Sequence, residues 1–224
     1  MLKWGIVSGR ADRILIVGTG PSIEHVGQTH VENVDAYVIL VNRALKHFDP
    51  PRGAWFTLDP SNQNREMLAE NEGRRRPGLA YYMAVPTDYG LPNAAIVAHR
   101  DPPEAGVTFL HRLTGLGLYK HLPGLSNSLS GVHSGNSAYG ALGIAYLMRP
   151  KKVALIGVDG YGGYAFDEGL PGKDVLVGLN SMFKTTVRQL TMNGVEVVNG
   201  SPQSLITCFP RWAPQDALEW ISQP

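Results

Sequence analysis

Two glycines after a short apolar run are the first residues of the sequence whose types and spacing suggest chemistry. Gly18 and Gly20 follow residues 13–17, and Ser22 lies two positions further along the chain. A glycine turn between a buried strand and a helix lets the backbone approach a phosphate group, which the free N–H groups of the helix can bind. Ser22 would cap that short helix. The alternative is a structural turn without a ligand, because a lone motif of this kind has low specificity.

The residues around this turn argue against a dinucleotide site. Such a site carries a third glycine where this chain has Ile23, and an acidic residue after the second strand, where it has Asn42 and Arg43. The sequence contains neither a Gly-x-x-x-x-Gly-Lys-Ser/Thr phosphate loop nor a Gly-x-Ser-x-Gly nucleophile elbow. NAD binding is therefore disfavoured.

Polar residues follow several other apolar runs. Asn42, Asp59 and Asp159 each come directly after a run that predicts a buried strand. In an open α/β sheet, ligands bind beyond the carboxyl ends of the parallel strands. Together with the glycine turn, these residues predict one polar site at that edge. The alternative is that they only begin loops, as Asn and Asp commonly do.

Two tyrosines lie among glycines after Asp159. Tyr161 and Tyr164 lie in the segment 160–164, and the three remaining residues of this segment are glycines. A tyrosine hydroxyl donates a hydrogen bond to a phosphate oxygen without adding charge, and glycines let a loop close over a ligand. We expect a lid at about residues 160–175. The alternative is a tyrosine pair that only covers the sheet edge.

The composition of the 224 residues is that of a globular protein, with 43% hydrophobic and 17% charged residues. Lys and Arg number 20 against 19 Asp and Glu, so there is no basic surplus for a general nucleic-acid-binding surface. The single cysteine, Cys208, excludes an internal disulfide. The N-terminus has too short an apolar run for a signal peptide, and no stretch reaches the roughly 18 apolar residues of a membrane span. We therefore expect a cytoplasmic protein.

The metal-binding residue types are scattered along the chain. The seven histidines form no His-Glu-x-x-His or His-x-His pattern, and no Asp-x-Asp occurs. The sequence therefore predicts no metal site.

Apolar runs alternate with segments of helical spacing along most of the chain. The expected strands are 13–17, 36–41, 54–58, 79–85, 94–98, 152–158 and 195–198. The expected helices are 22–26, 62–72, 134–147, 174–193 and 201–222. The segment 101–131 shows no clear period. This alternation predicts an α/β fold with a mostly parallel, doubly wound sheet. Since no repeat or linker divides the chain, residues 1–224 are expected to form one domain.

These residues together resemble a known family of transferases. The segments 16–22, 41–43, 134–167 and 195–205 are similar to the bacterial lipooligosaccharide sialyltransferases, glycosyltransferase family 42. The related domain of unknown function 115, which includes 6-hydroxymethylpterin diphosphokinase-like proteins, shares much of this pattern. Short members of this kind are common among phage and prophage proteins. The resemblance is thin between residues 65 and 130.

The resemblance implies a single Rossmann-like domain whose lid closes over a CMP-sugar. It implies transfer without a metal ion or other cofactor, and a homo-oligomer. The residues that match the family's nucleotide-binding positions are Thr19, Asn42 and Asp59 for its three asparagines, Ser134 and Gly135 for its Ser-Gly pair, and Tyr161 and Tyr164 for the two tyrosines that bind the leaving phosphate.

Two departures from the family concern catalysis. The family has an arginine where this chain has Gly131, and its base is a lid histidine, whereas no histidine follows His133 here. His133 and Asp167 are the candidate bases. His133 is favoured because the unperturbed pKa of histidine, about 6.5, suits a base near neutral pH.

The leading hypothesis is a nucleotide-sugar-dependent glycosyltransferase of the CMP-sugar type that needs no metal. Its partners would be a nucleotide or nucleotide-sugar and an unidentified acceptor, in the host cytoplasm if the protein is phage-encoded. Its catalytic residues would be His133, Tyr161 and Tyr164, and its nucleotide-binding residues Gly18, Thr19, Gly20, Ser22, Asn42, Asp59, Ser134, Gly135 and Asp159. One alternative is a Mg²⁺-dependent diphosphotransferase of the hydroxymethylpterin diphosphokinase-like type, with Asp59 and Asp159 as ligands. The other is a non-catalytic nucleotide-binding module.

Overall fold

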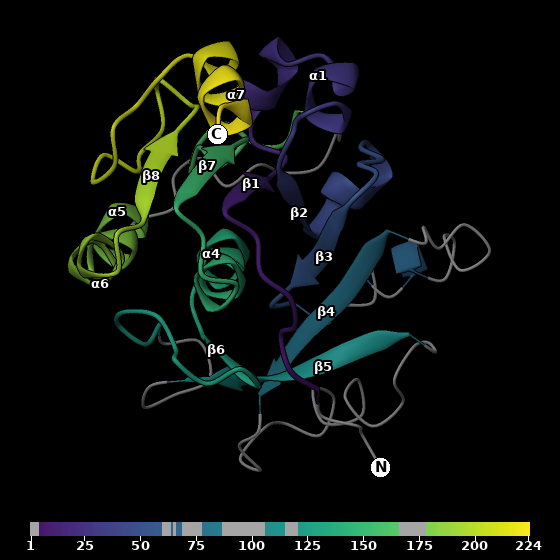
Figure 1. Ribbon diagram of the computed structural model, residues 1–224, viewed down its shortest axis with the longest axis vertical. Helices are drawn as coiled ribbons and strands as arrows, with labels where there is room; N and C mark the ends of the chain where they lie inside the picture. Colours follow the sequence, from purple (N-terminus) through teal and green to yellow (C-terminus); the bar gives the residue numbers. More distant parts are fainter. Residues whose placement is uncertain are drawn as a thin grey trace.

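The protein folds around one parallel β-sheet with helices on both faces (Figure 1). The computed structural model describes residues 5–59, 64, 66–68, 78–86, 106–114, 121–165 and 178–224. Eight strands of these residues form the sheet in the order β6-β5-β4-β3-β2-β1-β7-β8, and every pairing is parallel. The predicted α/β, doubly wound fold is confirmed. The strands are β1 Arg13–Val17, β2 Tyr37–Val41, β3 Gly53–Thr57, β4 Leu79–Pro86, β5 Val107–Leu113, β6 Gly131–His133, β7 Lys152–Ile156 and β8 Glu196–Asn199.

Helices cover the sheet from both sides and create two hydrophobic cores. On one face pack α4, α5 and α6; on the other pack η1, α1, η2 and α7. Their bounds are η1 Pro21–His25, α1 Gln28–Glu32, η2 Asn42–Lys46, α4 Ser137–Leu147, α5 Leu179–Lys184, α6 Val187–Met192 and α7 Pro214–Ser222.

The residues of β1 show why a continuous apolar run forms a central strand. Successive side chains of a strand point to opposite faces of the sheet. Ile14 and Ile16 therefore enter the core beneath α4, while Leu15 and Val17 enter the core beneath α7 and η1. A strand buried on both faces needs apolar residues at every position, as the sequence predicts.

Helix α4 lies close to the sheet because of its small residues. It packs on β1, β2, β3 and β6. A Cβ atom at Gly140 would lie 2.8 Å from the Phe56 ring, so only glycine lets the helix approach β3 this closely. The helix begins at Ser137, three residues later than predicted, because the side chain of Asn136 caps it by accepting a hydrogen bond from the Ala138 N–H at 2.7 Å.

Several predicted elements differ from those in the structure. Strand β5 lies in the segment 101–131, whose pattern showed no clear period, and β6 begins at the last residue of that segment. The predicted helix 174–193 is two helices, α5 and α6, over its described part, and the predicted helix 201–222 begins only at Pro214. Gly20, not Ser22, is the N-cap of the first helix, which is a 3-10 helix. The predicted strand 94–98 and the lid beyond residue 165 lie outside the described residues.

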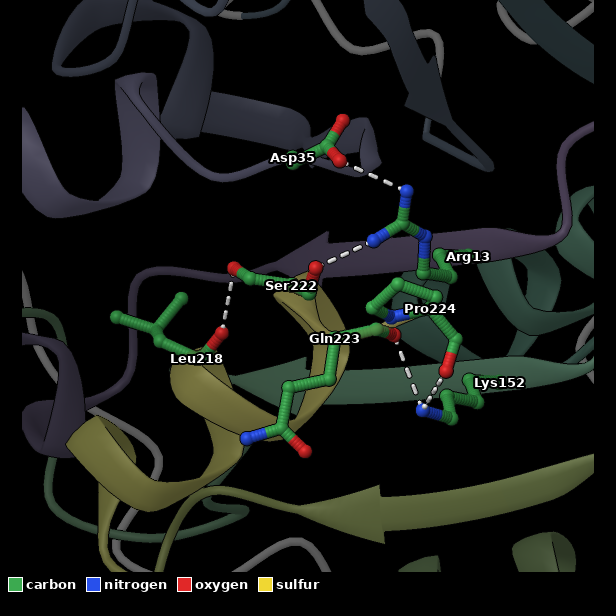
Figure 2. A network of polar contacts seen from close by, with 7 residues as sticks. All are labelled: Arg13, Asp35, Lys152, Leu218, Ser222, Gln223 and Pro224. Carbon is green, nitrogen blue, oxygen red and sulfur yellow. Dashed lines mark hydrogen bonds and ion pairs between the residues drawn. The ribbon is translucent and has the colours of Figure 1, made fainter.

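The C-terminal end of helix α7 is bound at the amino ends of β1 and β7, opposite the carboxyl ends of these strands (Figure 2). The Arg13 guanidinium donates to the Ser222 carbonyl oxygen and forms an ion pair with Asp35 at 2.8 Å. The Lys152 ammonium donates to the carbonyl oxygens of Gln223 and Pro224 at 3.0 and 3.2 Å. Both cations come from the first residues of strands and bind carbonyl oxygens of the C-terminal residues, so these contacts are structural.

None of the helices built by the described residues is long and apolar enough to cross a membrane.

Candidate functional site

A pocket opens where the strand order reverses. The chain leaves β1 towards β6 and then returns to the other side of β1 to form β7. In doubly wound sheets this switch point, beyond the carboxyl ends of the strands, is the usual place for a ligand. The pocket is lined by Gly18, Thr19, Gly20, Val41, Asn42, Asn136, Ser137, Ala138, Gly157, Val158, Asp159, Gly160, Tyr161, Gly163, Tyr164 and Leu179.

The two glycines of the turn let the loops after β1 and β7 approach each other. The N–H of Gly20 donates to the Gly157 carbonyl oxygen at 2.8 Å. A Cβ atom on Gly18 would lie 2.3 Å from that same oxygen, and one on Gly20 would lie 2.3 Å from Asp159 Oδ2. Real side chains do not make contacts this short, so both positions require glycine for packing between protein groups, whether or not a ligand binds.

Asp159 lies in the pocket wall and is buried, with 1% of its surface exposed. Its Oδ2 accepts hydrogen bonds from the N–H and the hydroxyl of Ser22, each at 3.0 Å. Its Oδ1 is also buried and accepts no hydrogen bond from any residue that the structure describes. Ser22 faces Asp159 from behind and is not one of the lining residues.

Asn42 reaches the pocket from the end of β2. Its φ of 51° lies in the left-handed region, which asparagine tolerates better than most residues. Its Oδ1 accepts a hydrogen bond from the Thr57 hydroxyl at 2.7 Å, and its carbonyl oxygen accepts one from the Trp55 indole at 2.7 Å. These bonds fix the asparagine side chain in the pocket wall.

Both predicted tyrosines line the pocket. The Tyr161 hydroxyl donates to Gln203 Oε1 at 3.1 Å. Burial, and then the negative charge of Asp159, raise the pKa of Tyr161 above its ordinary value of 10.0, so this hydroxyl remains a donor at neutral pH. Tyr164 is 46% exposed at the pocket rim. The Ala165 N–H donates to the Thr19 carbonyl oxygen at 2.8 Å, which joins the tyrosine segment to the glycine turn.

The start of α4 completes the pocket. Asn136, Ser137 and Ala138 line it. From the sequence, Ser134 and Gly135, just before these residues, were expected to bind the nucleotide. The structure instead buries Ser134 and packs Gly135 so closely that a Cβ atom there would lie 2.6 Å from Met182 Sδ. An Asn-Ser pair before a small-residue helix was the signal available for the lining residues.

A buried arginine next to Ser134 was missed in the sequence. Arg112 belongs to β5, and its Nε donates to Ser134 Oγ at 2.9 Å while its Nη1 donates to the Leu58 carbonyl oxygen at 2.9 Å. A guanidinium is thus present beside the helix start, from the neighbouring strand, although residue 131 is glycine. It fixes the β6–α4 turn that presents Asn136 and Ser137.

Two predicted residues lie outside the pocket lining. His133 ends β6, and its Nδ1 is 2.9 Å from the Gly124 carbonyl oxygen. Donation from Nδ1 would leave Nε2 as the atom that can accept a proton. The side chain of Asp59 is exposed. Asp59 and Asp159, the two candidate Mg²⁺ ligands, therefore do not share the pocket wall. Within the described part of the chain, no three His, Cys, Asp or Glu residues gather as a metal site would require.

Comparison with solved structures shows what the fold resembles. No protein-family model matches the sequence, and a search of curated proteins finds no relative. The structure is similar to the sialyltransferase CstII from Campylobacter jejuni in complex with the substrate analogue CMP-3FNeuAc. The TM-score is 0.52 and the identity 13%, over 92% of this chain and 88% of that one. A structure of the same enzyme with a trisaccharide acceptor and CMP gives a TM-score of 0.52 at 13% identity, over 94% of this chain and 88% of that one. At these identities the similarity is one of fold.

Proposed function

We propose that the protein is a nucleotide-dependent transferase, and specifically a glycosyltransferase that uses a CMP-activated sugar without a metal ion. The observation that carries this proposal is the pocket at the switch point of the sheet. It contains Thr19, Asn42, Asp159, Tyr161 and Tyr164, which are far apart in the sequence. The fold is shared with a sialyltransferase whose solved structures contain CMP or a CMP-sugar analogue.

The chemistry would depend on stabilising the leaving phosphate. When a sugar separates from a nucleotide, negative charge grows on the phosphate oxygens, and donors placed there lower the barrier. Tyr161 and Tyr164 supply hydroxyl donors on one side of the pocket. The first residues of α4 supply backbone N–H groups and the positive end of the helix dipole on another side.

The base that accepts the acceptor's proton remains the prediction made from the sequence. His133 would act through Nε2, since its Nδ1 lies against the Gly124 carbonyl oxygen. His133 is not a lining residue, so the acceptor would have to extend out of the pocket to reach it, or a bound water would have to connect the two. His133→Ala tests this role: transfer at the parent's rate would eliminate His133 as the base.

Calorimetric titration with CMP, CTP and ATP, each with and without Mg²⁺, tests the proposed function. We expect binding of CMP that does not depend on Mg²⁺. A requirement for a triphosphate and Mg²⁺ would instead indicate the diphosphotransferase. The position of His133 away from the pocket lining is the observation that favours a non-catalytic module. CMP binding without turnover of a CMP-sialic acid donor would support that second candidate.

A further inference from the structure

We infer that Asp159 recognises the nucleoside part of the ligand, through a hydroxyl or amino group that donates a hydrogen bond to Oδ1. Ser22 and Ser201 would be positioning residues that orient the carboxylate for this contact. The inference rests on the proposed function, because it takes the ligand to be a nucleotide. It assigns the glycine turn to the nucleoside end of that ligand rather than to its phosphate.

The two carboxylate oxygens of Asp159 have different surroundings. Oδ2 accepts two hydrogen bonds from Ser22, whereas Oδ1 accepts none within the described ranges of the chain. A buried carboxylate oxygen without a donor costs free energy, since water cannot reach it to compensate. A donor on a bound molecule that reaches Oδ1 from the pocket, which Asp159 lines, would satisfy this oxygen. This hydrogen bond would therefore stabilise only the complex and not the free protein.

A chain of hydroxyls fixes the orientation of this carboxylate. Ser22 Oγ lies 3.0 Å from Asp159 Oδ2 and 2.6 Å from Ser201 Oγ, and the Gly157 N–H donates to it at 3.2 Å. A hydroxyl has one hydrogen, and a carboxylate oxygen only accepts. Ser22 therefore donates to Asp159, and Ser201 must donate to Ser22. Both serines are buried, so the chain runs inside the protein.

The segment that contains Ser201 also supports the rest of this wall. The Ser204 hydroxyl donates to the Val158 carbonyl oxygen at 2.9 Å, and the Leu205 N–H donates to the Asp159 carbonyl oxygen at 2.8 Å. Gln203 accepts the hydrogen bond of the Tyr161 hydroxyl. The segment 201–205 resembled the transferase family in sequence, and the structure shows what its polar residues contact.

Charge decides which end of a nucleotide fits beside Asp159. The Cβ position of Gly20 is 2.3 Å from Oδ2, so the glycine turn and the carboxylate form one surface. A phosphate placed there would face a buried negative charge at short range, where solvent screens repulsion poorly. Ribose hydroxyls and an exocyclic amino group carry no charge and donate hydrogen bonds. They share the chemistry that Oδ1 requires, and the experiment distinguishes between them.

Asp159→Asn is the informative variant. Ser22 presents two donors to Oδ2, so the carbonyl oxygen of the asparagine must face Ser22, and its NH₂ group must take the place of Oδ1. An acceptor is thereby replaced by a donor of the same size. We expect the affinity for CMP, measured by calorimetry, to fall by about 10–100-fold.

Three analogues identify the group that Asp159 contacts. The parent and Asp159→Asn are titrated with 2′-deoxy-CMP and 3′-deoxy-CMP, which each lack one ribose hydroxyl, and with UMP, which has a carbonyl oxygen in place of the amino group and an N–H at N3. For the analogue that lacks the contacted donor, the parent should lose affinity and the Asp159→Asn variant should bind no worse than the parent. Parent-like CMP affinity in Asp159→Asn would overturn the inference, and so would an equal loss with CMP and all three analogues.

Ser201→Ala tests the positioning role. Without the Ser201 hydroxyl, Ser22 can turn its hydrogen away from Asp159, so the preference for CMP over the identified analogue should decrease by about 3–10-fold. The matched control is Thr186→Ala, which removes a buried hydroxyl bonded to the Phe183 carbonyl oxygen outside the pocket. It should lower the melting temperature and leave this preference unchanged. An unchanged preference in Ser201→Ala would remove Ser201 from the proposal.

The proposed function and this inference can fail separately. If the parent does not bind CMP, the proposed function fails, and titration with cytidine, uridine and adenosine follows. Binding of any of these nucleosides that is lost in Asp159→Asn would still support the inference. Binding of none of them, or binding that Asp159→Asn leaves unchanged, would overturn it.

Discussion

At the scale of single residues, the pocket contains two kinds of hydrogen-bonding group in different places. Asp159 is a buried acceptor beside the glycine turn, while Tyr161 and Tyr164 are donors on the segment that follows it. A nucleotide also has two ends, a nucleoside with donors and a phosphate that only accepts. The arrangement of the pocket matches that polarity, which a cluster of positive side chains would not.

The tyrosine hydroxyls should contribute to turnover. Replacing both residues, as Tyr161→Phe/Tyr164→Phe, keeps the rings and removes the donors. If they stabilise the leaving phosphate, hydrolysis of a CMP-sialic acid donor should slow by about 10²–10⁴-fold, while the affinity for cytidine changes little. Hydrolysis at the parent's rate would contradict the role assigned to them.

The pH dependence of Tyr161 has a definite sign. Burial and the nearby Asp159 charge raise its pKa above 10.0, so the hydroxyl keeps its proton to a higher pH than a free tyrosine does. The ultraviolet absorbance of the parent and of Tyr161→Phe is measured as the pH rises. The difference between the two, which reports Tyr161 alone, should develop above pH 10. A difference spectrum that develops below pH 10 would contradict this prediction.

Gly20 is packed so closely against the loop after β7 that a substitution there should affect stability as well as ligand binding. A valine at this position would be expected to block a ligand, but its Cβ would also meet Asp159 Oδ2 at 2.3 Å and the Gly157 carbonyl oxygen at 2.9 Å. Gly20→Val should therefore lower the free energy of unfolding by about 2 kcal/mol or more, as measured by denaturant titration. Parent-like stability would show that the two loops separate easily.

At the scale of elements, the sequence predicts best the parts that are buried on both faces. β1, β2, β3 and β7 have continuous apolar runs. The residues Thr19, Asn42 and Asp159, which follow β1, β2 and β7, line the pocket, whereas Asp59 after β3 does not. β6, at the edge of the sheet, and its neighbour β5 were not predicted because they have polar positions, including His133 and Arg112. Their identity depends on partners distant in the sequence. The same holds for the Ser22–Ser201 contact, which spans 179 residues.

Arg112 should stabilise the turn between β6 and α4. Its guanidinium satisfies Ser134 Oγ and the Leu58 carbonyl oxygen, both of which Arg112→Met would leave without this donor. We expect a loss of about 2 kcal/mol in the free energy of unfolding, together with weaker CMP binding because the start of α4 shifts.

Arg10→Met is the control for Arg112→Met. Arg10 is exposed and pairs with Asp12 at the opposite edge of the sheet, so its replacement should change stability by less than about 0.5 kcal/mol. Equal effects of the two substitutions would show that Arg112 is not structural.

At the scale of the whole molecule, the pocket joins segments from both halves of the sheet. Thr19 and Asn42 follow strands on one side of the switch point, and Asp159 follows the strand on the other.

A ligand that contacts both halves binds the folded chain and not the unfolded one, so it must raise the melting temperature. At a concentration 100 times its Kd, CMP should stabilise the fold by about 2.7 kcal/mol, which is about 5–10 °C for a chain of this length. The shift should be the same in EDTA, because the proposed contacts are hydroxyls, backbone N–H groups and one carboxylate. A shift that EDTA abolishes and Mg²⁺ restores would mean that a cation joins the phosphate to the protein, and the diphosphotransferase would then be the better description.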